Sequence, residues 1–211
     1  SEPLLAAVAG LPHGELTAAL SSLRRSEFIV ERSLFPVPIY AFKHPLAQEI
    51  ALGALLKDRR RQIHGAVARA LDQEPGRPEE RAALLAHHWE EAGECFLAAR
   101  AHRDAAEWVG LTDLNAAAWH WGRVRAQVRN LADVPEAAGL GLMACTHLLN
   151  LSWRYEVSAD EIKAMLEEGR AFARAVGDVA AEVKVAIVYN RACCSAGDLS
   201  TYVDIALENL E

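Results

Sequence analysis

The chain has 211 residues, of which 52% are hydrophobic and 24% charged, the balance of a soluble globular protein with a substantial core. Its formal net charge of −7 argues against general attraction to nucleic acid or to anionic membranes. No apolar run approaches the ~20 residues of a membrane span, and no signal peptide is visible. The four cysteines show no framework spacing, so we expect reduced thiols and a cytoplasmic location.

The first part of the chain mixes helical and strand-like patterns. Short helices are predicted over 3–8 and from Gly14 onward, where leucines and alanines recur at helical spacing. Aromatic and β-branched residues at 28–32 and 39–43, with two prolines between them, predict a β-hairpin. A helix is expected to start at Pro45, because proline lacks the N–H that the first helical position leaves unpaired. The order helix, helix, hairpin, helix is that of a winged-helix domain.

From Glu79 onward the pattern is helical throughout. A small or β-branched residue followed by glycine recurs at 92–93, 109–110, 176–177 and 196–197, which marks helix ends. Alanine-rich helices are predicted at 80–91, 96–108, 114–131, 135–153, 159–176, 179–195 and 199–210. Pairs of this length match a tetratricopeptide period of ~34 residues only loosely. The sequence therefore predicts a mainly α protein: a winged-helix-like domain (1–62), a connecting helix and turn (63–78) and an α-solenoid of degenerate tetratricopeptide-like helix pairs (79–211).

One stretch carries a resemblance to a known family. It reads YAFKHPLAQEIALGALLKDRRRQIHGAVARALD from Tyr40 to Asp72, and LLAHHWEEAGE follows from Leu84 to Glu94. This resembles the segment after the ATPase module in bacterial STAND-class signalling ATPases, most of all those fused to class III adenylate/guanylate cyclase domains. Relatives of that class are large ATPase transcription activators. The resemblance covers residues 16–131 and implies a winged-helix domain followed by tetratricopeptide-like repeats.

Motifs for catalysis are absent from the sequence. There is no G-x-x-x-x-G-K-[ST] phosphate loop, no G-x-S-x-G, no H-E-x-x-H and no EF-hand loop. We therefore expect a non-enzymatic chain without a cofactor of its own. The chain starts without Met and stops within a helical pattern, so we expect a piece of a larger protein whose upstream ATPase domain holds ATP or ADP.

His44 is the main candidate site residue. It stands where a strand meets a helix N-terminus, a position that favours anions. The resemblance implies that a winged-helix histidine at this place contacts the phosphate of ADP bound to the upstream ATPase and holds the inactive state. The alternative from the residues alone is a half-buried histidine that caps the helix starting at Pro45.

Other candidates are weaker. Asn190 and Arg191 lie on a helix of the kind that lines the concave face of a solenoid, and they are candidates for partner binding. His87 and His88, with Glu91 and Cys95, form a metal-like cluster, but adjacent helical histidines diverge by ~100°, so no metal site is predicted. Cys145 and His147 do not face each other and receive no role. The five tryptophans either line a ligand groove or, as helical spacing favours, pack in the core.

DNA binding was weighed for the basic run Arg59–Arg60–Arg61. Residues 1–62 have a charge balance of only +2, which is weak for a DNA-binding domain. Arg24 and Arg25 stand at the C-terminal end of the would-be recognition helix, whereas such helices read bases near their N-terminus. The sequence therefore favours a regulatory, protein-interaction segment that couples nucleotide state to a protein or small-molecule signal. A DNA-binding regulator and a free-standing repeat scaffold are the alternatives.

Overall fold

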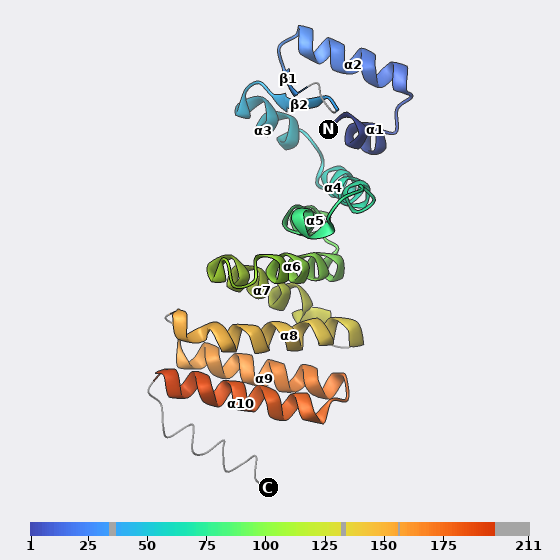
Figure 1. The fold of residues 1–211 in the computed structure, drawn as a ribbon. Helices are drawn as coiled ribbons and strands as arrows, with labels where there is room; N and C mark the ends of the chain where they lie inside the picture. The colour runs from blue at the N-terminus through green and yellow to red at the C-terminus, as the bar shows by residue number, and fades with distance from the viewer. Residues whose placement is uncertain (34–36, 132–133, 156, 197–211) are drawn as a thin grey trace. The chain divides into compact units, whose positions relative to one another are not determined.

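The structure, a computed structural model, describes residues 1–33, 37–131, 134–155 and 157–196 (Figure 1). These described residues form ten α-helices, two short 3-10 helices and one two-stranded sheet, which confirms the mainly α class. They divide into two compact units. The N-terminal unit contains residues 1–78 and 87–94, and the C-terminal unit contains residues 79–86 and the described residues from Cys95 onward.

The N-terminal unit contains the predicted hairpin. Strands β1 (Ile29–Ser33) and β2 (Ile39–Phe42) pair antiparallel, with Ile29 opposite Phe42. The buried side chains Leu16 and Leu20 of α2 pack with Ile29 and the partly buried Tyr40. The helices of this unit are α1 (Glu2–Ala9), α2 (His13–Arg25), α3 (Pro45–Gly53) and α4 (Lys57–Asp72).

The start of α3 confirms the expected role of Pro45. His44 has an extended backbone with φ −127° and ψ 131°, as expected for a residue before proline, and Pro45 takes the first helical position. The apolar residues of α3 are not buried: Leu46 and Ile50 are 63% and 64% exposed, and α3 has no buried residue. The described residues thus leave the apolar face of α3 uncovered.

Helix α4 is one unbroken helix, and the boundary predicted after residue 62 lies inside it. The run Arg59–Arg60–Arg61 belongs to the first turns of α4 rather than to the end of the preceding helix. Gly65 on α4 is buried, and a Cβ atom there would lie 3.6 Å from Cβ of Ala92 at the end of α5 (Pro78–Ala92). This is an ordinary van der Waals distance, so a methyl group at position 65 would fit against the last turn of α5.

Five helices build the C-terminal unit beyond α5, and each packs against the next in chain order (Figure 1). They are α6 (Cys95–Val109), α7 (Leu114–Val128), α8 (Pro135–Leu151), α9 (Ala159–Ala175) and α10 (Val179–Ala196). They confirm the predicted helices, with 3-10 turns at 129–131 and 152–154 where α7 and α8 were expected to continue. The helix predicted at 199–210 lies outside the described residues.

Glycine ends several of these helices, as predicted. Gly93, Gly110 and Gly177 have φ values of 82°, 46° and 72°, a region that disfavours residues with a Cβ atom. Gly197, the fourth predicted helix end, lies outside the described residues.

A buried cation ties α7 to α9. Arg125 is 6% exposed, and its Nε and Nη2 donate hydrogen bonds of 2.7 and 3.0 Å to the two carboxylate oxygens of Glu168. Arg125 also pairs with Glu161, and the exposed Arg129 donates to Glu168 at 3.0 Å. Sequence patterns did not indicate this cluster, because the two residues of each hydrogen-bonded pair are 36 to 43 residues apart in the chain.

Among the described helices, none is by itself long and apolar enough to cross a membrane. Only α1 and α2 together reach the necessary length and composition, and they are bent by 116° relative to each other.

Candidate functional site

A pocket of about 390 Å³ opens between α6, α7 and α8 in the C-terminal unit. Its volume falls within the range of roughly 300–1,000 Å³ that is typical of small-molecule sites. Most of its wall is apolar, and three polar side chains contribute to it. The lining residues are Ala106, Glu107, Gly110, Leu111, Leu114, Ala117, Trp121, His147, Asn150 and Leu151.

Two stacked rings form one wall of this pocket. The indole of Trp121 on α7 and the imidazole of His147 on α8 lie parallel within 3°, with ring centroids 4.3 Å apart. Burial lowers the pKa of His147, although the nearby Glu107 carboxylate opposes this effect. The imidazole is therefore mainly neutral at neutral pH, so the stack presents uncharged aromatic surface to the pocket.

Core packing, which helical spacing favours, is found for Trp89 and Trp121, which are 7% and 3% exposed. It is wrong for Trp108 and Trp153, which are 48% and 62% exposed. Trp121 lines the pocket, whereas Trp119, two residues away and on another face of α7, is 59% exposed. The indole of Trp119 lies edge-on to His102 and His120.

Cys145 lies two residues before His147 on α8 and is fully buried. Burial raises the pKa of its thiol to about 12, so the thiol stays protonated at neutral pH. It is therefore a packing residue, and it supplies no nucleophile to the pocket.

His44 lies at the N-cap of α3, as expected. Its side chain is exposed and makes no capping hydrogen bond, while its backbone carbonyl accepts from the Ala47 N–H at 3.0 Å. The alternative of a half-buried capping histidine does not match this geometry. The imidazole is accessible to a ligand from outside the described residues.

Asn190 and Arg191 point in different directions, because they are adjacent on α10. Asn190 is 8% exposed and Arg191 is exposed. Arg191 lines a small hollow of about 20 Å³ with Trp153 and Ser195. The structure therefore does not bring the two predicted partner-binding side chains together.

Two of the five arginines considered for DNA binding pair with carboxylates: Arg60 with Glu91 at 2.5 Å and Arg24 with Glu31 at 2.8 Å. Arg59 donates a hydrogen bond to the side-chain oxygen of Gln62 at 3.4 Å.

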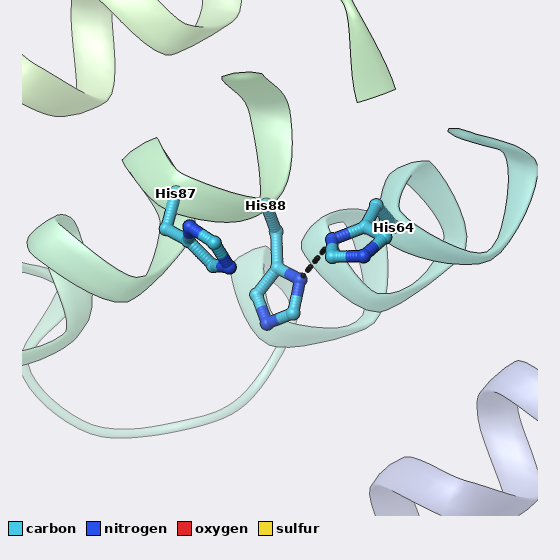
Figure 2. Close-up of side chains that lie close together, drawn as sticks. All are labelled: His64, His87 and His88. Carbon is cyan, nitrogen blue, oxygen red and sulfur yellow. Dashed lines mark hydrogen bonds between the residues drawn. The ribbon is translucent and has the colours of Figure 1, made fainter. Parts of the chain in front are cut away.

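Three histidines of the N-terminal unit gather in one place (Figure 2). His64 comes from α4, and His87 and His88 come from α5. One ring nitrogen from each lies within 4.8 Å of the other two, and Nδ1 of His88 lies 3.1 Å from Nδ1 of His64. Sequence reasoning noticed His87 and His88 but not His64, which is 24 residues away from His88. Cys95, which was considered with them, is not part of this group.

Comparison of the chain with family models, with curated proteins and with solved structures gives no match. The residues and their geometry are therefore the basis for assigning a function.

Proposed function

We propose that the chain is a non-catalytic regulatory segment of a larger signalling ATPase. In this proposal a winged-helix domain is followed by an α-solenoid of degenerate tetratricopeptide-like helix pairs. The observation that carries it is the pocket between α6, α7 and α8, which offers a place for a small-molecule signal. The lack of a phosphate loop in the sequence and the inert Cys145 thiol support a binding role rather than catalysis.

The lining of the pocket favours a particular class of ligand. The aromatic rings of Trp121 and His147 in the lining favour an aromatic ligand, because aromatic groups attract each other beyond the effect of burial. Glu107 is the only charged residue in the lining, so it disfavours anions. We therefore propose an uncharged or weakly cationic aromatic molecule as the signal.

Filling the pocket is expected to weaken the binding of an aromatic ligand. An uncharged aromatic dye such as phenylnaphthylamine should bind the chain with increased fluorescence. Leu114→Trp places a large ring at the partly buried first residue of α7, where it occupies ligand space. We expect the dissociation constant of the dye to rise by about tenfold or more, measured by fluorescence titration.

Leu84→Trp is the matched control, because Leu84 is 47% exposed on α5 and does not line the pocket. Its dye affinity should equal that of the unaltered chain. If the Leu114→Trp variant binds the dye as tightly as the unaltered chain, or if the unaltered chain binds no dye, the proposal of ligand sensing in this pocket loses its basis.

The N-terminal unit is proposed to dock on the upstream ATPase domain. The support is the uncovered apolar surface at Leu46 and Ile50 of α3 and at Leu56, which are 63%, 64% and 81% exposed. Exposed apolar clusters of this kind mark interaction surfaces. The output of such a protein, by resemblance, is a cyclase domain or transcription control. ATP or ADP then belongs to the upstream domain and not to this segment.

Replacing His44 with alanine tests the nucleotide-sensing part of the proposal. In the parent protein, loss of a hydrogen bond to the charged ADP phosphate should weaken ADP binding by about 10- to 100-fold. Basal activity should rise, because ADP stabilises the inactive state. The isolated chain should melt at an unchanged temperature, since the exposed His44 side chain caps no helix. His44→Gln keeps a donor and is the control. Unchanged ADP affinity in the His44→Ala variant of the parent protein would show that His44 does not contact the ADP phosphate.

A further inference from the structure

The three histidines His64, His87 and His88 present ring nitrogens at one point of the N-terminal unit. One nitrogen of each ring lies within 4.8 Å of the other two, and His64 and His88 are partly buried while His87 is exposed. Imidazole nitrogen is the commonest protein ligand of transition-metal ions, so the group offers up to three such ligands at one place.

The spacing of the rings fits coordination of a single ion. Zinc bonds to histidine nitrogen at about 2.0–2.1 Å, so two ligands of a tetrahedral ion lie about 3.3 Å apart. The Nδ1 atoms of His64 and His88 are already 3.1 Å apart. The third ring must move closer, since the nitrogens of the group are separated by up to 4.8 Å. His87 is exposed, so its side chain is able to rotate toward the other two (Figure 2).

Charge near the cluster is balanced. Glu91 lies one turn beyond His87 and His88 on α5, and its negative charge acts on both His64 and His88. The hydrogen bond from Arg60 lowers the pKa of Glu91, so its carboxylate is ionised at neutral pH. Arg60 adds positive charge beside His64, and its ion pair with Glu91 offsets this charge. The paired charges of Glu91 and Arg60 therefore largely cancel at the cluster, and the histidine nitrogens are the ligands available to a cation.

A second histidine pair in the chain shows what distinguishes this cluster. His102 and His120 lie in the C-terminal unit with Nδ1 atoms 2.8 Å apart, but both are buried and, among the described residues, no third metal-ligating side chain joins them. Transition-metal sites need three or four convergent ligands and a path for the ion to enter. Among the described residues, the group on α4 and α5 combines three ligands with an exposed member.

We propose that His64, His87 and His88 bind one divalent first-row transition-metal ion, Zn²⁺ in particular, with a fourth position open to water. Imidazole suits Zn²⁺, Ni²⁺ and Cu²⁺ better than Mg²⁺ or Ca²⁺, which prefer oxygen ligands. The bound ion replaces the hydrogen bond between His64 and His88. Because its ligands come from two helices, it fixes the last turns of α5 against α4.

The test uses the 211-residue chain after removal of metals with a chelator. Calorimetric titration with Zn²⁺ should give one ion per chain, and Co²⁺ should give the intense visible absorption of a tetrahedral site. His64→Ala, His87→Ala and His88→Ala should each weaken Zn²⁺ binding by about 100-fold or more, since even residues that only orient ligands contribute 10- to 100-fold.

The exposed His13 lies outside the cluster and provides the matched control. His13→Ala should keep the Zn²⁺ affinity of the unaltered chain. His87→Ala removes an exposed side chain, so its effect on binding cannot be attributed to unfolding, and thermal melts of all metal-free variants verify this. Zn²⁺ binding that is absent, or that survives each of the three cluster substitutions, would overturn the proposal. Because the pocket of the C-terminal unit is untouched, dye binding there is an independent readout.

Discussion

Replacing Arg125 with alanine is expected to lower the free energy of unfolding by about 3 kcal/mol. Removing one partner of a buried ion pair typically costs about 3–5 kcal/mol, because the remaining charge is left without compensation. Arg125 is buried, but the Glu168 side chain is 26% exposed, so the lower end of that range applies. Denaturant unfolding followed by circular dichroism measures the effect.

Arg129→Ala is the matched control, because Arg129 also pairs with Glu168 but its side chain is 51% exposed. Exposed ion pairs contribute about 0–1 kcal/mol, so this variant should remain close to the unaltered chain. The double change Arg125→Met with Glu168→Met should recover much of the loss, since apolar side chains of similar volume often replace a buried ion pair well. Similar losses for Arg125→Ala and Arg129→Ala would show that burial of the pair does not determine its contribution.

The same pair predicts acid sensitivity. Burial alone would raise the pKa of Glu168, but the hydrogen bonds and charges of Arg125 and Arg129 together hold it below its usual value of 4.5. A carboxyl whose pKa is lower in the folded state stabilises the fold above its unfolded pKa. This contribution is lost as the pH falls through the folded pKa. Unfolding measured from neutral pH to below 4.5 should therefore show a smaller acid effect in Glu168→Gln than in the unaltered chain.

Local sequence signals accounted for the secondary structure. Alternating β-branched and aromatic residues indicated β1 and β2, Pro45 indicated the start of α3, and glycines after small residues indicated the ends of α5, α6 and α9. These signals act within a few residues of chain, where backbone sterics and capping decide the conformation. The uncovered apolar face of α3 was not predictable, because helical periodicity shows that a face is apolar but not what covers it.

Long-range contacts decide the parts of the site that sequence reasoning missed. The divergence of adjacent helical histidines argued against a metal site at His87 and His88. A third histidine, His64, comes from another helix, α4, and one ring nitrogen of each of the three histidines lies within 4.8 Å of the other two. Trp121 and His147 meet in the same way across α7 and α8. The spacing of apolar residues along a helix does not specify which other helix packs against it. The periodicity of a single sequence therefore indicates candidate residues but not the residues that they contact.

Replacing Gly141 with alanine is expected to destabilise the C-terminal unit, although alanine is the better helix former. A Cβ atom at Gly141 on α8 would lie 2.5 to 2.7 Å from three ring atoms of Phe172 on α9. Phe172 is 4% exposed and packs in the core cluster, so its ring has little room to turn away. Overpacking of this kind costs about 1–3 kcal/mol, and the lack of free space favours the upper end.

The same helix provides the control. Gly139 on α8 has no atom within 4 Å of its built Cβ, so Gly139→Ala should raise the free energy of unfolding by about 0.5–1 kcal/mol through helix propensity alone. The two substitutions are chemically identical and two residues apart, so opposite signs isolate the contact with Phe172. Adding Phe172→Leu should reduce the cost of Gly141→Ala, and a double-mutant cycle measures this coupling. If both glycine variants gain stability, α8 and α9 do not approach each other closely at Gly141, and the packing of this helix pair must be looser than the structure describes.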